Sequence, residues 1–600
     1  MYIRRIIISN FRGIKSATIL LDGNGVFVGD NNSGKSTILE ALDLVMGPDR
    51  LSQHPIINEH DFYAGEYLKD DLPIEITVEV TVVDLSEEQQ RHFGNNIEWW
   101  NENDKSILNG PPAIETDSEG VIPALRLTFK GSYDLEEDDF TGQTFFASSL
   151  REGLIPEPFR AKDKRMCGFL YLRTMRTGNR ALSLERGSLL DVILQMKEIK
   201  PQMWENVLVQ LKEITVAAEP SLGISEILSS VQDSLSSLVP YETANQPQIR
   251  VSNLTREHLR KVLTVFMGSS ISDSSNKEYA TPFHHQGTGT INTLVLSLLS
   301  MIADIKDNVI FAMEEPEIAL PPHIQKRVVM SVIEKSTQAL FTSHSPYVLE
   351  EFDPNSLWVV SRKDGVLEVV PAGMPPAVKK KLYQDEFRKR FCESLLSRRV
   401  LIAEGRTELD VYATAARKLQ SLHPTQNLSL ELLGFALVNA ETDTQVEPLG
   451  NYYKALNKTV YAVFDKQKEL AKEKIVSAVD YVYEAQEHGL ENVVLNGIDI
   501  EVLRRYGRHL IECGEWPCHL SECAPNNDMS EDEVRDALFQ FFKKKKGEGA
   551  LAALVSFCAE DEMPAFIRET IYEISQTIYP PKCTAEANTA IAAKSAEYSE

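Results

Sequence analysis

The sequence predicts an α/β protein, because three stretches combine a short β-forming run, a polar turn and a helix-forming run in that order. These stretches are VFVGDNNSGKSTILEALDLV (26–45), DNVIFAMEEPEIALPPHIQ (307–325) and LIAEGRTELDVYATAARKL (401–419). In parallel α/β sheets such turns gather at the carboxyl ends of the strands, where ligands bind. We therefore expect the functional residues of this chain to lie in the turns.

Composition limits the classes of function. The chain has 600 residues, 43% of them hydrophobic, which is enough for roughly two to four domains with real cores. Its net charge of −26 excludes a protein that coats nucleic acid through bulk electrostatics, so any contact with DNA should be local and metal-assisted.

The chain shows no targeting or membrane signal. The start, MYIRRIIISNFRG, has too short an apolar run for a signal peptide, and no later run approaches a membrane span. Seven scattered cysteines indicate free thiols, with zinc at Cys513, Cys518 and Cys523 as a remote alternative. We expect a cytoplasmic protein without a membrane partner.

The first turn has the phosphate-loop spacing of Gly29, four residues, then Gly34-Lys35-Ser36. The strand 26–28 before it and the helix after it supply the context that this pattern requires. Backbone N–H groups would face the phosphates, Lys35 would add charge and Ser36 would reach a magnesium ion. A chance Gly/Ser turn is the disfavoured alternative. The predicted nucleotide-binding residues are Gly29, Asn32, Gly34, Lys35, Ser36 and Thr37.

Two further turns suit ATP chemistry. The strand 309–313 ends in Glu314 and Glu315, of which the first suits magnesium and the second suits polarisation of water. About thirty residues on, a short apolar strand ends in Ser343 and His344, and a histidine there can contact a γ-phosphate or its attacking water. The polar run 286–290 opens a long apolar helix and is a second anion site, which we assign to the nucleotide of another subunit.

As an ordered set, NFRGIKS, GDNNSGKST, QGTGT, MEEPEIAL and TSHSP resemble the ABC-type ATPase head of SMC-like proteins. EEPEIALPP and TSHSP resemble, more narrowly, the overcoming-lysogenisation-defect (OLD) family of ATP-dependent nucleases. The resemblance implies two heads closing on ATP, between the phosphate loop of one and Gly287, Thr288 and Gly289 of the other. It also implies that Glu314 binds magnesium, Glu315 is the hydrolytic base and His344 the sensor. Asp61, in EHDF, would link the ATP site to the rest of the head.

The head motifs are discontinuous. Residues 163–280 are apolar at helical spacing with few β signals, and we expect a helical insertion there that serves dimerisation, plain core helices being equally compatible with the pattern. Residues 85–145 are expected to form strands with a solvated acidic loop. The expected domains of the head are 1–162, the insertion 163–280, and 281–375.

The second half repeats the strand, acid, helix plan. Strand 400–403 ends at Glu404, and strand 460–464 ends at Asp465. In a parallel sheet these acids converge on one edge, and carboxylates without a nearby counter-ion suit a divalent metal.

This half resembles a Toprim domain, the metal-dependent fold that OLD nucleases share with topoisomerases and primases. By that resemblance Glu404, Glu408 and Asp465 would bind one magnesium or manganese ion, Asp499 and Glu501 a second, and Lys546 in the run 543–546 would be the catalytic lysine. The basic run is otherwise a solvated helix end. Gln467 stands where the family usually has a second aspartate. The domain is expected over 395–585, followed by a flexible tail, 586–600.

Three hypotheses remain. The first is an ATP-gated DNA endonuclease of the OLD type in antiviral defence, working as a homodimer or higher even oligomer, with a helicase or other defence partner encoded nearby. The second is a DNA-repair or scaffold ATPase whose Toprim fold has lost its metal, which Gln467 motivates. The third is a Toprim domain that makes primers or acts on RNA.

Overall fold

The computed structural model describes most of the chain. The described residues are 1–47, 56–108, 110, 120–172, 183–184, 188–197, 200–213, 224–238, 255–272, 278–287, 291, 294, 297–298, 301, 309–318, 320–375, 388–517, 524–525, 529–546 and 548–579. The chain forms two compact units. One comprises Met1–Phe27, Gly34–Phe352 and Arg362–Glu368; the other comprises Val28–Ser33, Asp353–Ser361 and Val369–Glu600.

The larger sheet has thirteen strands in the described part of the chain, in the order β11-β14-β15-β3-β16-β17-β2-β1-β6-β9-β7-β8, with β10 beside β9. Their bounds are β1 Tyr2–Phe11, β2 Ile14–Leu20, β3 Gly25–Val28, β6 Ile76–Val83, β7 Ile97–Asn101, β8 Ser106–Leu108, β9 Val121–Asp134, β10 Asp139–Phe146, β11 Phe169–Leu172, β14 Ile310–Glu314, β15 Gln338–Thr342, β16 Leu357–Lys363 and β17 Val366–Pro371. A separate two-stranded sheet joins β4 (Leu68–Lys69) to β5 (Leu72–Pro73).

This sheet is parallel at one end and antiparallel at the other. Strands β11, β14, β15 and β3 pair parallel with one another. Strands β1, β2, β6, β7, β9 and β10 pair antiparallel. The acidic segment 135–138 forms the exposed turn between β9 and β10. The described part of 85–145 thus has the expected strands and solvated loop, together with a short helix over Glu87–His92 that was not expected.

Five helices accompany this sheet in the described residues: α1 Lys35–Met46, α2 Glu87–His92, α3 Ala161–Cys167, α10 Pro322–Lys335 and α11 Pro346–Leu349. Helix α1 packs against β6, β9, β11 and β14, and eight of its residues are buried. Burial on several faces explains why its sequence, ILEALDLV, is apolar nearly all round.

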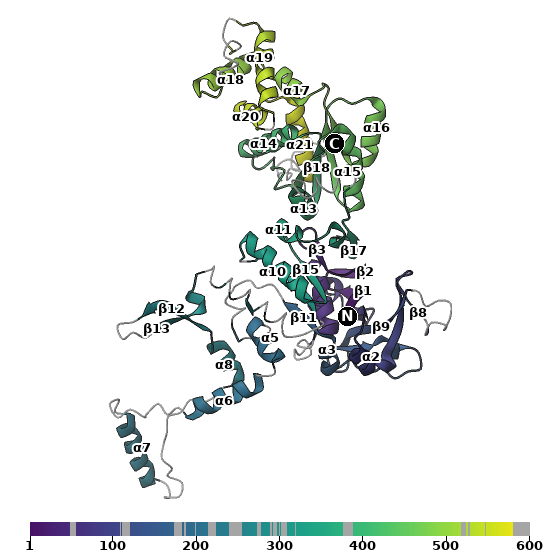
Figure 1. Cartoon of the computed structure of the whole chain (residues 1–600), viewed down its shortest axis with the longest axis vertical. Helices are drawn as coiled ribbons and strands as arrows, with labels where there is room; N and C mark the ends of the chain where they lie inside the picture. The colour runs from purple at the N-terminus through teal and green to yellow at the C-terminus, as the bar shows by residue number, and fades with distance from the viewer. Residues whose placement is uncertain are drawn as a thin grey trace, which may run out of the picture. The chain divides into compact units, whose positions relative to one another are not determined.

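Residues 163–280 contain helices and two unexpected β segments (Figure 1). The helices are α5 Leu189–Met196, α6 Lys200–Glu213, α7 Ile224–Leu238 and α8 Arg256–Val262. Leu184, Trp204 and Leu259 form a small core among them. Strand β11 belongs to the larger sheet, and β12 (Phe266–Ser272) pairs with β13 (Glu278–Pro282). The predicted helices are therefore present in the middle of this region. The strands at its two ends, β11 and the pair β12–β13, were not predicted.

The second unit contains a four-stranded, fully parallel sheet in the order β19-β18-β20-β21. Its strands are β18 Arg399–Ala403, β19 Phe435–Asn439, β20 Thr459–Phe464 and β21 Tyr481–Glu484. The helices of this unit are α13 Arg388–Leu396, α14 Arg406–Leu422, α15 Asp443–Ala455, α16 Glu469–Ala478, α17 Leu490–Gly497, α18 Ile500–Glu512, α19 Glu531–Lys544, α20 Ala550–Phe557 and α21 Ala565–Ile578.

Two apolar clusters lie on the two faces of the smaller sheet. Val400, Ile402 and Ala462 pack with residues of α15 and α16. Leu401 and Tyr461, whose side chains alternate with those, pack with α14 and with α17 to α21. Burial on both faces is what a continuous apolar run such as VLIA (400–403) requires. The predicted mixed α/β fold with parallel strands in both halves is confirmed.

The four strands that place the predicted turns are present within one residue of their expected bounds, as β3, β14, β18 and β20. Among the described residues no helix is long and apolar enough to cross a membrane.

Candidate functional site

Three of the expected segments meet at one edge of the larger sheet. Strands β3, β15 and β14 are neighbours and parallel, with Phe27 opposite Thr342 and Thr342 opposite Glu314. The turns that follow these strands therefore leave from the same edge. They carry the phosphate loop, the Ser343-His344 pair and the Glu314-Glu315 pair.

The phosphate loop needs its glycines for conformation and for space. Gly29 has φ 148° and Gly34 has φ 107°, values that side-chain-bearing residues rarely adopt. A Cβ on Gly34 would lie 2.7 Å from the Leu367 side chain. Asn32, with φ 63°, is a tolerated left-handed residue.

Helix α1 starts directly after this loop. Gly34 is its N-cap, so no side chain caps the first turn, and that turn contains no acidic residue. The Lys35 side chain is buried at the same helix end. A helix N-terminus of this kind, joined to a lysine, binds phosphate groups. Ser36 and Thr37 occupy the first turn, so the predicted nucleotide-binding residues form one continuous segment.

The acids after β14 are held in place by specific partners. Glu314 is buried, and its Oε1 accepts a hydrogen bond of 2.6 Å from the hydroxyl of Tyr171 on β11. Glu315 has the left-handed φ of 44°, and its N–H donates to the carbonyl of Thr342 at 2.8 Å. A positive φ at a glutamate is uncommon and is found at functional sites.

A third acid, Glu317, was not predicted as a functional residue. Its carboxylate accepts hydrogen bonds from the backbone N–H of His344 at 2.6 Å and from the Ser343 hydroxyl at 2.9 Å. Burial raises the pKa of Glu317 above its ordinary value, against the effect of these donors. The sequence signal was the repeated acid in MEEPE.

The structure describes Asp61 fully, but only part of the run 286–290, the signature segment expected to contact the ATP of another subunit. Asp61 is buried, receives a 2.8 Å hydrogen bond from the Arg12 guanidinium, and Arg12 also pairs with Glu40 of α1. Asp61 is thus connected to the helix that follows the phosphate loop. Gly287 is an exposed residue with open space around it, while Thr288 and Gly289 lie outside the described residues.

A second group of acids lies at the carboxyl edge of the smaller sheet. Glu404 follows β18 and Asp465 follows β20, and these strands are parallel neighbours with Ala403 opposite Val463. The backbone N–H of Asp465 lies 3.4 Å from the Glu404 carboxylate. The predicted convergence of these two acids is therefore present in the structure.

Glu408 joins them from the first turn of α14. A Cβ on Gly405 would lie 2.6 Å from Glu408 Oε2, so the glycine provides the space that this carboxylate occupies. Among the described residues, buried Oε2 of Glu408 has no hydrogen-bond partner. An unsatisfied carboxylate oxygen is costly unless a cation or donor completes it.

Burial and mutual repulsion raise the pKa values of these acids. Burial and then the Asp465 charge raise the pKa of Glu404. Burial, Asp465 and Glu491 raise the pKa of Glu408. Burial also raises the pKa of Asp465, although Gly489 N–H donates to it at 2.6 Å. The Lys546 charge acts against these shifts at Glu408 and Asp465, yet both pKa values stay raised.

Glu491 was missed by the sequence analysis. It lies in the first turn of α17, acts on both Glu408 and Asp465, and has the Lys546 ammonium 3.8 Å from its carboxylate. The signal was a third strand, acid, helix unit, VYEAQEHGLENVV, whose acid stands seven residues beyond the strand. Lys546, just after α19, is thereby brought to the cluster.

Gln467 acts here as a donor. Its side-chain N–H donates to Glu404 Oε1 at 3.1 Å, and its backbone N–H donates to Glu484 at 3.0 Å. The side-chain amide of Gln467 therefore orients Glu404 through its N–H group. Its oxygen takes no part in that contact.

Asp499 and Glu501 have another local role. Asp499 is the N-cap of α18, and its carboxylate accepts the backbone N–H of Glu501 at 2.8 Å on the surface. This is the usual function of an aspartate before a helix. Their part in a second metal site therefore stays a prediction, and the described contact of Asp499 is that of a helix cap.

The acids fit a hard divalent cation by chemistry and burial. Carboxylate oxygens are the ligands that magnesium and manganese prefer, and the unsatisfied oxygen of Glu408 would be completed by such an ion. Within the described ranges, however, no three His, Cys, Asp or Glu side chains are close enough together to hold a metal as they stand. Binding would therefore draw Glu404, Glu408 and Asp465 closer together.

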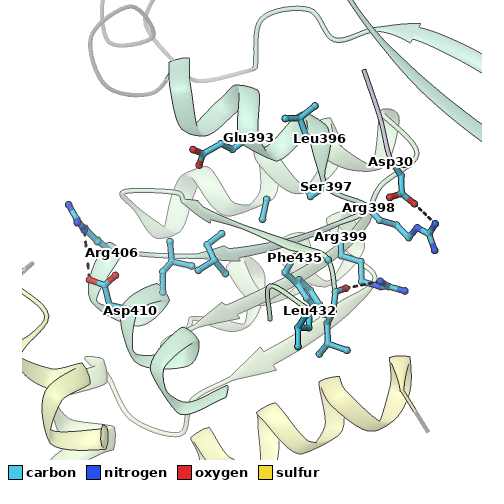
Figure 2. A pocket seen from close by; sticks show the side chains of 15 residues that line it. Asp30, Glu393, Leu396, Ser397, Arg398, Arg399, Arg406, Asp410, Leu432 and Phe435 are labelled. Carbon is cyan, nitrogen blue, oxygen red and sulfur yellow. Dashed lines mark hydrogen bonds and ion pairs between the residues drawn. The ribbon is translucent and has the colours of Figure 1, made fainter. Parts of the chain in front are cut away.

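The second unit also has a cavity of about 770 Å³, which is lined by arginine, acidic and leucine side chains (Figure 2). Several of its lining residues are close in sequence to Glu404 and Glu408, but its lining is not mainly acidic. Its arginines are already engaged. Arg399 donates to the carbonyl of Leu433 at 2.8 Å, Arg406 lies 3.7 Å from Asp410, and Arg398 pairs with Asp30. Leucine side chains line much of the remainder. Its charges are balanced, so we assign it no ligand.

The fold and the first site define a phosphate-loop ATPase joined in one chain to a parallel α/β unit with an acidic edge. A family model described as an AAA ATPase domain matches residues 1–136 and 171–349, more than half of the chain. The chain belongs to this family of ATPases.

Among known proteins, endonuclease GajA of Bacillus cereus (strain VD045) is 23% identical over 423 residues, which cover 68% of this chain and 66% of GajA. The match thus spans just under two thirds of that relative. The resemblance to OLD-type ATPase-nucleases that the motifs indicated is confirmed by the ATPase family match and this relative.

Two solved structures are also similar. An SMC head bound to the C-terminal winged-helix domain of ScpA has a TM-score of 0.33 at 15% identity, covering 62% of this chain and 98% of that one. The C-terminal region of the Burkholderia pseudomallei OLD protein has a TM-score of 0.23 at 13% identity, covering 30% and 98%. These TM-scores are too low to guide the interpretation of this chain.

Proposed function

We propose that this protein is an ATP-dependent, divalent-metal-dependent DNA endonuclease of the OLD type. The observation that carries the proposal is the cluster of Glu404, Glu408 and Asp465 at the edge of a second parallel sheet, in the same chain as a phosphate-loop ATPase domain. The endonuclease relative supports the same reading.

In the ATPase part, the residues divide by position. The backbone of the Gly29–Ser36 loop and Lys35 bind the phosphates, with Ser36 and Glu314 as magnesium ligands. Glu315 orients and deprotonates the attacking water, and His344 contacts the γ-phosphate. The Tyr171 hydroxyl holds the Glu314 carboxylate in one orientation.

In the second unit, which we interpret as a Toprim-like domain, Glu404, Glu408, Asp465 and Glu491 would hold the divalent ions. Magnesium or manganese bound there supplies a nucleophilic water and stabilises charge on the phosphate. Lys546 adds a positive charge beside Glu491 and would approach a DNA phosphate. Gln467 keeps Glu404 oriented toward the cluster.

The proposal includes assembly. A phosphate loop and a signature segment complete one ATP site only when they come from two copies, so we propose a homodimer or a higher even oligomer. Light scattering with and without ATP tests this, and a strict monomer under both conditions would contradict it. A cytoplasmic role in antiviral defence, with a partner such as a helicase, completes the proposal.

The direct test is cleavage of supercoiled plasmid DNA with magnesium, manganese or calcium, by wild type and by Glu404→Ala. We expect the wild type to nick or linearise the plasmid with magnesium or manganese and the variant to leave it intact. Equal cutting by both proteins would remove the nuclease assignment from this edge.

A second candidate is an ATPase that acts in DNA repair or as a scaffold, with an impaired metal site. It is favoured by Gln467, which brings an amide donor to Glu404 where a further carboxylate ligand is usual. Wild-type protein that hydrolyses ATP but cuts no DNA under any metal would establish this candidate.

A further inference from the structure

Glu317 is a partly buried acid beside the ATP-handling residues, and none of the roles proposed above uses it. We propose that Glu317 is a positioning residue that ties the turn carrying Glu315 to the loop carrying His344. The inference rests on the proposed ATP hydrolysis, because its purpose is to keep these two groups at a fixed separation.

The tie consists of two hydrogen bonds that the Glu317 carboxylate accepts. Oε1 of Glu317 accepts the backbone N–H of His344 at 2.6 Å, and Oε2 accepts the Ser343 hydroxyl at 2.9 Å. Hydrogen bonds to an ionised acceptor are shorter and stronger than those between neutral groups. A bidentate carboxylate therefore fixes both the position and the direction of the backbone at His344.

A second connection runs parallel to the first. The Gln325 side chain accepts the Ser345 hydroxyl at 2.6 Å and donates to the carbonyl of Leu320 at 2.8 Å. The N–H of Ser345 in turn donates to the Ser343 hydroxyl at 3.0 Å. Three consecutive residues after β15 are thus bonded to the segment after β14.

The other end of the tie is equally fixed. Glu317 lies in the turn that Glu315 begins, since the N–H of Ile318 donates to the carbonyl of Glu315 at 3.1 Å. The N–H of Glu315 donates to Thr342 at 2.8 Å, directly before Ser343. The base and the sensor therefore belong to one hydrogen-bonded body.

Burial of the bonded side chains means that only a carboxylate at position 317 can accept both hydrogen bonds. Ser343 is fully buried and Ser345 and Gln325 are nearly so, which means that water cannot replace a lost partner without rearrangement. A glutamine at 317 could accept only one of the two hydrogen bonds and would bring N–H groups to the other oxygen's place. Alanine would remove both of these hydrogen bonds.

The test measures ATP hydrolysis by the full chain. We expect Glu317→Ala to lower kcat about 10- to 100-fold, the cost of a small misplacement of catalytic groups. KM for ATP should change by about threefold or less, since no contact with ATP is removed. Glu317→Gln should retain more activity than alanine, because it keeps one acceptor. Glu334→Ala, an exposed acid on α10, is the matched control and should behave as wild type.

A wild-type kcat in Glu317→Ala would overturn the inference, as would a rise in KM that accounts for the whole loss. Ser343→Ala added to Glu317→Ala should cost much less than its effect in the wild type, since both remove the same contact. If the alanine variant does not fold, Glu317→Gln carries the kinetic test.

A second readout does not depend on hydrolysis. Without nucleotide, the backbone amides of residues 343–345 should exchange with deuterium faster in Glu317→Ala than in wild type, with the strands unchanged. Unchanged exchange at these residues would overturn the inference. A wild type that hydrolyses no ATP would instead refute the proposed function, and the exchange result would still decide the role of Glu317.

Discussion

The two acidic edges of this protein differ in how their carboxylates are satisfied. At the edge after β14, Glu314 receives the Tyr171 hydroxyl and Glu317 receives two donors from the loop after β15. At the edge after β18, Glu404 and Glu408 lie among other acids, and one oxygen of Glu408 has no donor in the described part of the chain.

The difference indicates how each site becomes active. The first site is organised by the protein itself, so its acids hold their positions before a ligand arrives. In the second, the acids raise one another's pKa values, and the function we propose for it requires a cation to relieve that repulsion. Experiments that remove, neutralise or add one carboxylate should therefore have different consequences at the two edges.

The largest expected effect is on DNA cleavage by Glu404→Ala and Asp465→Ala. Each change removes an acid from the proposed metal-binding edge, so strand cleavage should fall by several orders of magnitude with ATP hydrolysis nearly intact. Plasmid nicking and phosphate release, measured on the same preparations, check both statements. Loss of both activities together would show that the two edges do not work separately.

The converse change is Lys35→Ala. It removes the charge that contacts the β- and γ-phosphates, so ATP hydrolysis should collapse while manganese binding by the second unit stays as in wild type. Phosphate release and calorimetric titration with manganese measure the two effects. Lys162→Ala, at an exposed position of α3, serves as control. Weakened manganese binding in Lys35→Ala would contradict the separation.

The pH dependence of thermal stability tests whether Glu408 is destabilised by the neighbouring acids. Its pKa is raised above the ordinary 4.5, so its contribution to stability is present below pH 4.5 and is lost as pH rises through the folded-state pKa. In EDTA at pH 7.5, Glu408→Gln should therefore raise Tm by about 2–4 °C, which corresponds to about 1 kcal/mol.

The gain from Glu408→Gln should vanish near pH 4, where the wild-type carboxyl is protonated. Magnesium should raise the Tm of wild type more than that of the variant. Thermal unfolding followed by circular dichroism between pH 4 and 7.5 provides the measurement. A Tm that drops by the same amount at every pH would show that Glu408 is held by packing and not by relief of charge.

The smallest expected effect is that of Gln467→Asp. The change adds a carboxylate and removes the donor to Glu404, so metal-free protein should lose a little stability. The magnesium concentration for half-maximal nicking should fall by about tenfold or less, the range of effects of groups around metal ligands. An unchanged magnesium requirement would mean that position 467 does not face the ions.

The sequence predicted the turns well because turn position follows from strand direction alone. Once β3, β14, β18 and β20 were expected to be parallel, Lys35, Glu315, Glu404 and Asp465 had to leave from their carboxyl ends. The pattern also predicted the α/β class, since short apolar runs followed by helix-forming runs are typical of alternating strands and helices.

What the sequence could not predict depends on the fold in three dimensions. Glu491 reaches the acid cluster through the length of the turn between β21 and α17, which no local pattern determines. Asp499 matched the expected spacing equally well but is used as a helix cap. The donor role of Gln467 and the two contacts of Glu317 likewise depend on which side chains face each other across neighbouring strands.

The left-handed backbone of Glu315 also sets the local stability of the ATPase edge. An L-residue with φ near +44° costs about 1–3 kcal/mol relative to a relaxed backbone, and glycine would relieve that cost. Glu315→Gly should therefore yield an inactive protein that unfolds at a higher temperature than Glu315→Ala does. Glu315 therefore lowers the stability of the fold, and under the proposed function it places a carboxylate beside the ATP phosphates. A sequence selected for thermal stability alone would have glycine at this position.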